Sequence, residues 1–413
     1  MRSSPGFRRL LVASTISNLG DGVVIAAFPL VAASISSSPQ AVAGMTAAAT
    51  LPWLLFGLPA GVVVDRVDRV KLMWVIDLVR AVAVGLLGLA MVSGTVTLAP
   101  LYVVVFILGT AETLFDSAAM AVVPAVVDSG SLETANGRLF AGQLAANQFI
   151  GPPVGALLFG LVAALPAFID SITFLVSSLL LIGLRVAPAP KAVERRSMGA
   201  ELREGLLWVW RHNNIRTLAI GAAVINLAQT GAMAILVLFA SKVLGLAEIG
   251  FGSLFVVAAV GALAGSLGVG RVAAIWDRRR IVVAAVGAMS LSLFAIGLAR
   301  STPVTFVGMA VMSLSAEFWN VVAVSYRQGA TPDRLLGRVM SAYRFIAYGS
   351  FPLGALLGGW LAARFQLETT FVVGGALLAL LALFVARALD DFNQSAEREG
   401  FEPSGELYHP PLA

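Results

Sequence analysis

Long apolar runs separated by short polar breaks follow one another along the chain as far as residue 388. A helix that crosses a bilayer needs about 20 mainly apolar residues, because each residue adds about 1.5 Å to its length. Twelve runs reach that length, and each predicts a spanning helix: 9–35, 41–64, 71–93, 97–123, 136–161, 163–186, 215–241, 249–271, 280–299, 303–326, 338–363 and 368–388. The pattern therefore predicts an all-α membrane protein with twelve transmembrane helices.

The composition is that of a chain surrounded by lipid. Of 413 residues, 58% are hydrophobic and 12% are charged, whereas soluble domains carry about a quarter charged residues. There is no cysteine, which excludes disulfides, thiol catalysis and cysteine-ligated metals. The only histidines, His212 and His409, lie in polar stretches, and no phosphate-binding G-x-x-x-x-G-K-[ST] loop is present. We therefore expect no enzyme, no metal and no cofactor, and an ion gradient as the energy source.

Arginine and lysine residues orient the chain, because cytoplasmic loops are enriched in them. One predicted face carries the N-terminal Arg2, Arg8 and Arg9, the 65–71 loop, Arg138, the long 187–214 connection, Arg271, Arg278 to Arg280, Arg327, Arg334, Arg338, Arg387 and Arg398. The other face carries only Lys242, Arg300 and Arg364. Both termini are therefore expected in the cytoplasm, and the one-sided spread explains the net charge of +5 without a nucleic-acid partner.

Two halves of the chain repeat one another. Gly137-Arg138 matches Gly337-Arg338, and residues 153–158 (PVGALL) match residues 352–357 (PLGALL). Such repeats are typical of transporters built from two bundles related by an axis along the membrane normal. We predict a six-helix bundle at 1–186, a cytoplasmic linker with an amphipathic helix at 187–214, a second bundle at 215–388 and a cytoplasmic tail at 389–413.

A cluster of charge stands between the second and third predicted spans. Residues 61–71, GVVVDRVDRVK, resemble the G-x-x-x-D-R-x-x-R-[RK] signature of the major facilitator superfamily, with matches at Gly61, Asp65, Arg66 and Arg69. The resemblance implies that Asp65 and Arg66 help to lock a cytoplasmic gate. Asp65 would face the start of span eleven, where a carboxylate meets a positive helix N-terminus. A solvated loop that only sets topology is the alternative.

The fifth predicted span contains a second motif of this kind. Gly151, Pro152, Pro153 and Gly155 resemble the G-P-x-x-G core of an antiporter signature, and close helix packing is the alternative role. Segments 17–22, 76–81, 111–127, 132–155 and 168–175 are similar to an exporter branch that includes macrolide-efflux and enterobactin-exporter-like proteins. The Arg that many drug exporters carry in span four is missing from 101–123, and Arg80 on span three is the candidate to replace it.

Ionisable residues within the spans are functional candidates, because a charge at the bilayer centre costs about 2.5–3.5 kcal/mol. They are Asp21, Asp77, Arg80, Glu112, Asp116, Asp170, Glu317 and Arg344. The resemblance implies a central cavity lined by spans one, four, seven and ten. Its candidate lining is Asn18, Asp21, Glu112, Phe115, Asn226, Gln229, Glu317 and Trp319.

Asp21, Glu112 and Asp116 are the candidate proton carriers, since no basic partner is evident for Asp21 and Glu112 at equal depth. Asp77 and Arg80, three residues apart, favour a structural charge pair. Glu317 and Arg344 are either a second pair or substrate contacts, and Asp170 is expected to be structural.

These features predict a secondary transporter in a bacterial cytoplasmic membrane that exports an amphiphilic small molecule in exchange for protons. Carboxylates in the cavity favour a cationic or zwitterionic substrate, and we expect a monomer. A dedicated exporter of an endogenous metabolite such as a siderophore is the nearest alternative. A non-transporting sensor or a lipid-moving protein is a more distant one.

Overall fold

The computed structural model describes residues 4–57, 59–127, 131–184 and 198–389, and every regular element in them is a helix. The elements are α1 (Pro5–Ile35), α2 (Pro39–Phe56), α3 (Pro59–Arg66), α4 (Arg69–Val92), α5 (Leu98–Val126), α6 (Leu132–Leu144), the π-helix η2 (Ala145–Ile150), α7 (Gly151–Leu161), α8 (Leu165–Leu181), α9 (Met198–Arg211), α10 (Asn213–Lys242), α11 (Glu248–Ala273), α12 (Arg278–Ala299), α13 (Thr302–Ala330), α14 (Asp333–Arg364) and α15 (Leu367–Ala388). The prediction of an all-α protein is confirmed.

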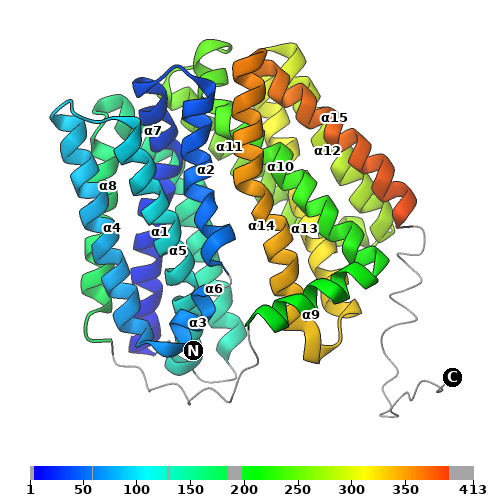
Figure 1. Cartoon of the computed structure of the whole chain (residues 1–413), viewed down its shortest axis with the longest axis horizontal. Coiled ribbons are helices and arrows are strands. Elements are labelled where there is room, and N and C mark those ends of the chain that lie inside the picture. Colours follow the sequence, from blue (N-terminus) through cyan, green and yellow to red (C-terminus); the bar gives the residue numbers. More distant parts are fainter. Residues whose placement is uncertain (1–3, 58, 128–130, 185–197, 390–413) are drawn as a thin grey trace.

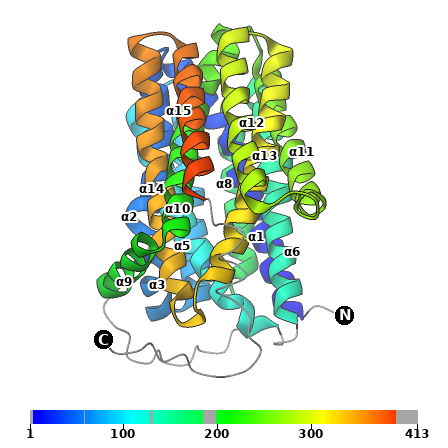
Figure 2. The ribbon, with the colours of Figure 1, turned by 90° about the vertical axis from the view of Figure 1, so that its right-hand side faces the viewer.

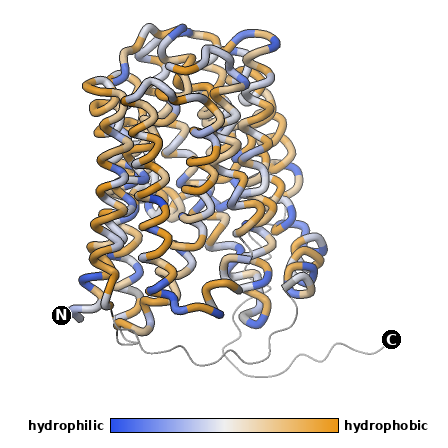
Figure 3. Tube along the Cα trace, turned by 60° about the vertical axis from the view of Figure 1, so that its left-hand side comes forward, coloured by the Kyte–Doolittle hydropathy of each residue, from blue (hydrophilic) through white to orange (hydrophobic). Residues whose placement is uncertain are grey.

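Ten helical segments of the described chain are long and apolar enough to cross a membrane. The remaining two predicted spans, 41–64 and 163–186, coincide with shorter helices: α2 followed by α3, and α8 with 17 residues. In the first of these, α3 begins at Pro59, a position where a proline without a backbone N–H is tolerated. Figure 3 shows hydrophobic positions along the helices and hydrophilic ones gathered toward their ends.

The helices form two groups, α1–α8 and α10–α15 (Figure 1). Within the first, α1 packs on α7 and α8, and α4 packs on α5 and α8; within the second, α10 packs on α14 and α15, and α11 packs on α13. The amphipathic α9 lies outside the second group against α14, where Arg338 pairs with Glu204 at 2.7 Å (Figure 2). We call the end that holds the starts of α1, α4, α10 and α12 the basic end.

The two groups meet along α2 with α14 and along α7 with α11. At the end opposite the basic one, Gly359 lies against Ala43. Nearby, the Lys242 ammonium donates a hydrogen bond to the Ser37 carbonyl at 3.1 Å. In Figure 1 the groups lie close together at this end and diverge toward the basic end.

A π-helical turn interrupts the fifth predicted span. Pro152 and Pro153 follow it directly, and neither can donate a backbone hydrogen bond. The turn Ala145–Ile150 therefore accommodates the missing bonds, as π-bulges do at many functional sites. This break positions Asn147 beside α1.

Candidate functional site

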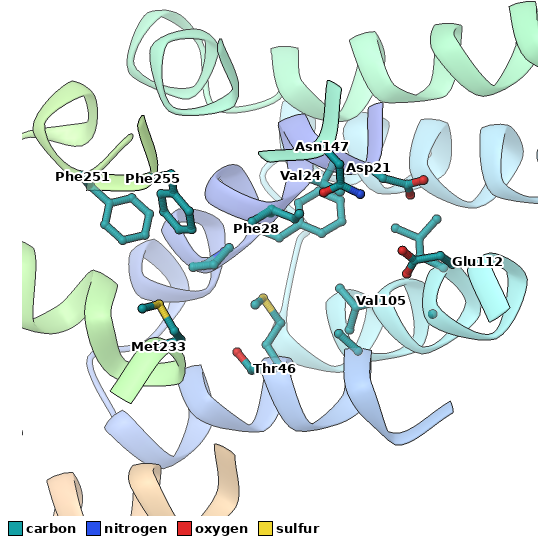
Figure 4. A pocket seen from close by; sticks show the side chains of 16 residues that line it. Asp21, Val24, Phe28, Thr46, Val105, Glu112, Asn147, Met233, Phe251 and Phe255 are labelled. Carbon is teal, nitrogen blue, oxygen red and sulfur yellow. The ribbon is translucent and has the colours of Figure 1, made fainter. Parts of the chain in front are cut away.

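A cavity of about 340 Å³ lies between the two helix groups. It is lined mainly by apolar side chains of α1, α2, α5, α10 and α11, and Asp21 and Glu112 are its only acidic residues. Figure 4 shows the two carboxylates on one side of the cavity and Phe251 with Phe255 on the opposite side. An apolar chamber with two acids at one wall suits an amphiphile with a positively charged group.

Two glycines hold Asp21 in place. A Cβ at Gly20 would collide with Thr173 and Asp170 of α8, and a Cβ at Gly22 would lie 2.6 Å from the Ala146 carbonyl oxygen of η2. Only glycine permits these approaches, so α8 and η2 press on α1 at both sides of the aspartate. The sequence Gly-Asp-Gly thus places a carboxylate where three helices meet.

Arg80 of α4 is the partner of Asp21. Its Nη1 lies 3.5 Å from Asp21 Oδ2 and 3.8 Å from Asp77 Oδ1, and its side chain is 1% exposed. The guanidinium also lies over the rings of Phe115 and Phe174, 5.7 and 4.9 Å from their centroids. The expectation that Asp21 lacks a basic partner is therefore wrong, because α4 brings Arg80 to it across 59 residues.

Five carboxyl groups interact with Arg80, and two of them, those of Asp21 and Asp77, lie within 4 Å of it. Besides Asp21 and Asp77, those of Glu112, Asp116 and Asp170 interact electrostatically with Arg80. Asp170 is fully buried, and neither of its carboxyl oxygens has a hydrogen-bond partner among the described residues. Burying several like charges beside one counter-charge is very unfavourable. The structure thus gathers several acidic groups around one counter-charge in a buried region.

The antiporter-like motif packs directly against this cluster. A Cβ at Gly151 would overlap the backbone of Gly22, and one at Gly155 would overlap that of Val23. The motif thus brings α7 onto α1 immediately after Asp21. Pro153 also borders Gly252 of α11. The motif residues therefore connect the carboxylate region to the contact between the two helix groups.

A second cavity, of about 430 Å³, lies among α10, α13 and α14. Asn226, Gln229 and Trp319, which the sequence places in the substrate cavity, line this space and not the first one. The Asn226 amide donates to the Ala347 carbonyl at 2.8 Å, and the Gln229 amide lies 3.3 Å from the Met289 sulfur. Arg344 also lines this cavity.

Other candidates lie outside both cavities. Asn18 is buried and donates to the Ser14 carbonyl at 2.8 Å, and Phe115 is a core residue beneath Arg80. Asp116 borders neither cavity. Glu317 packs at Gly265 of α11, and among the described side chains no ion pair joins it to Arg344. No group of three or more His, Asp or Glu side chains in the described part of the chain is arranged to hold a metal ion.

The gate motif follows the break after α2. Gly61 and Arg66 are exposed on α3, and the guanidinium of Arg69 donates to the Ala121 carbonyl at 2.9 Å. The side chain of Asp65 lies outside the described side chains. Asp68, the departure from the usual glycine, caps α4 by accepting from the Lys71 amide at 2.9 Å. Asp277 caps α12 in the same way in the second half of the chain.

Similar proteins are known along almost the full length of the chain. Residues 3–412 match the family described as transmembrane secretion effector. The multidrug efflux pump Tap of Mycolicibacterium fortuitum is 27% identical over 401 residues, which cover 92% of this chain and 95% of that one. Macrolide efflux protein A of Streptococcus pyogenes is 25% identical over 350 residues, covering 81% and 83%.

Solved structures of transporters share the fold. A bacterial homologue of the iron transporter ferroportin, in an inward-facing state, superimposes with a TM-score of 0.75 at 14% identity, covering 93% of this chain and 98% of that one. A bacterial homologue of the lysosomal transporter Spinster, inward-facing and occupied, gives 0.74 at 14% identity, covering 96% and 98%. At this identity the likeness is one of fold.

Proposed function

This chain belongs to the transmembrane secretion effector family of the major facilitator superfamily, and on that premise we propose that it exports amphiphilic small molecules in exchange for protons. It is a transporter rather than an enzyme, and a multi-pass protein of the bacterial inner membrane. The names of its relatives support multidrug or macrolide efflux as the kind of transport. Cavity carboxylates favour cationic or zwitterionic substrates among these.

Alternating access is the proposed transport mechanism. All twelve predicted spans would cross the membrane, with both termini and the basic end in the cytoplasm. In that orientation, the approach of the two helix groups opposite the basic end would make the present arrangement inward-facing. Asp65 and Arg66, with Gly61 and Arg69, would lock the cytoplasmic side once the groups rock together there. A single chain suffices for this cycle.

The crowding of carboxyl groups around Arg80 carries the proposal of proton exchange. Asp21 links the cluster to the cavity, since it both contacts Arg80 and lines the chamber with Glu112. A cation in the chamber favours ionised carboxylates and so displaces protons from them, and protons returning displace the cation. The acids would titrate as a coupled group, with no single residue owning the proton.

Proton flux in proteoliposomes tests this function. The purified protein is reconstituted with a trapped pH-sensitive dye, and ethidium or erythromycin is added as the probe. We expect a probe-dependent proton flux in the wild type, which Asp21→Asn and Glu112→Gln each abolish. Glu201→Gln on α9, which removes a carboxylate far from the cavity, should leave the flux unchanged. If both cavity variants exchange protons at the wild-type rate, the coupling site lies elsewhere.

A further inference from the structure

The second cavity is lined by two arginines and no acidic residue, and the proposed proton exchange does not explain these charges. Arg327 of α13 and Arg344 of α14 are its charged residues. The other lining residues are apolar, aromatic or amide side chains, and none of those that line it is acidic. Two cations within spanning helices are costly unless something neutralises them.

Arg327 is the more constrained of the two. Its side chain is 4% exposed, and its Nε and Nη1 have no hydrogen-bond partner among the described residues. The guanidinium stacks on the Tyr343 ring, 3.4 Å from the centroid. A cation–π contact stabilises a charge by less than the cost of leaving that charge buried and unpaired. Arg327 therefore places a positive charge at the wall of the cavity that its contact with Tyr343 does not fully offset.

Arg344 supplies a second cation that has no ion-pair partner among the described residues. It is exposed where it borders the cavity, and it makes no ion pair with any described side chain. Glu317, the nearest candidate from the sequence, packs instead against α11 at Gly265. The excess positive charge of this cavity is thus not cancelled from within the described chain.

We propose that this cavity binds an anionic oxygen group, a carboxylate or a phosphate, carried by the transported amphiphile. Guanidinium groups bind such groups through paired N–H donors, and Asn226, Gln229 and Asn320 add amides around them. Because the ligand is taken to be the transported molecule, this inference rests on the proposed function.

The position of the cavity on α10 links it to the acidic chamber. Met233 lines the acidic chamber, and Gln229, four residues earlier on the same helix, lines the basic one. Four residues of helix rise by about 6 Å. The two cavities therefore border adjacent turns of the same helix. A zwitterionic amphiphile matches the charges of both linings, whereas a simple cation matches only one.

Thiol labelling of the cysteine-free chain measures the charge of each cavity directly. Single-cysteine proteins carry Asn320→Cys in the basic cavity or Thr46→Cys in the acidic one. Each is treated in detergent with an anionic (sulfonatoethyl) or a cationic (trimethylammonioethyl) methanethiosulfonate reagent. We expect the ratio of anionic to cationic rates to be at least about tenfold higher at Asn320→Cys than at Thr46→Cys. Adding Arg344→Gln, or Arg327→Gln, should lower the ratio at Asn320→Cys.

A matched pair of dyes then identifies the ligand. Tetramethylrhodamine, with a free carboxylate, should slow labelling of Asn320→Cys, while its methyl ester and inorganic phosphate should not. Arg327→Lys keeps the charge and should keep the rate ratio, which separates charge from loss of folding. An equal ratio of anionic to cationic rates at Asn320→Cys and Thr46→Cys, or equal protection by the methyl ester, would overturn the proposal. Because labelling needs no transport, a failure of proton exchange leaves this result independent.

Discussion

Arg80 Nη1 lies 3.5 Å from Asp21 Oδ2, so a buried ion pair joins α4 to α1 next to the acidic cavity. Asp21 is 13% exposed and Arg80 is 1% exposed, so the aspartate is accessible from the cavity while the arginine is buried. In the proposed exchange, a proton or a cation that reaches Asp21 from the cavity would compete with Arg80 for the same carboxylate. This competition gives a direct physical route from cavity occupancy to the contact between two helices.

Removing Arg80 should destabilise the protein because it leaves Asp21 and Asp77 without a counter-charge. Losing one partner of a buried pair typically costs about 3–5 kcal/mol. We expect Arg80→Gln to lower the melting temperature of the purified protein clearly, and the double variant Arg80→Gln/Asp21→Asn to recover part of the loss. Thermal unfolding followed by size-exclusion chromatography measures both. Additive effects of the two substitutions would contradict an interaction between the residues.

Asp170 should tolerate loss of its charge. Both of its carboxyl oxygens are buried without a hydrogen-bond partner, and among the described residues no ion pair includes it, so an amide in its place breaks no such contact. Asp170→Asn keeps shape and polarity and is expected to leave the melting temperature near that of the wild type. Asp77→Asn, which removes the 3.8 Å contact to Arg80, is the comparison and should be less stable. Equal destabilisation by the two variants would contradict this prediction.

The apolar pattern of the sequence predicted the helices well, because insertion into lipid depends on the local run of residues. It could not predict the partner of a charge across the fold. Asp77 and Arg80 are three residues apart, and this spacing predicts a local pair. Asp21 meets Arg80 because α1 and α4 both pack on α8, which no local spacing indicates. The glycines on both sides of Asp21 were the available signal for that packing.

Arg327 shows the same limit at a helix end. Hydropathy ended the tenth span at residue 326 and assigned Arg327 to a cytoplasmic connection, but α13 continues to Ala330 and buries the side chain on Tyr343. The cation–π contact with Tyr343 of α14 stabilises Arg327 inside the helix, although the hydropathy of the sequence excludes it from the span. An arginine one residue beyond a predicted span is therefore worth treating as part of it.

The proposed orientation, with the basic end in the cytoplasm, predicts which cysteines an impermeant reagent can label in intact cells. Ser37 is exposed between α1 and α2 at the end opposite the basic one, so Ser37→Cys should react from outside. Gly199 is exposed at the start of α9, with space for a side chain, and Gly199→Cys should react only after permeabilisation. The chain has no other cysteine to give background. The reverse pattern would place the basic end outside.

The contact of Gly359 with α2 should hold the present arrangement of the two helix groups. A Cβ at this position would lie 2.5 Å from Ala43 Cβ and 3.1 Å from the Pro39 carbonyl oxygen, so only glycine fits while the groups touch there. Gly359→Val is therefore expected to separate them at that end and to favour the outward-facing state. The readout is labelling of Thr46→Cys, in the acidic cavity, by an impermeant reagent added outside intact cells. We expect the rate to rise several-fold over the parent with Gly359 intact.

Gly287→Val on α12, where a Cβ meets nothing within 4 Å, is the matched control and should not change the labelling rate. An unchanged rate in a well-expressed Gly359→Val protein would mean that this contact does not govern access.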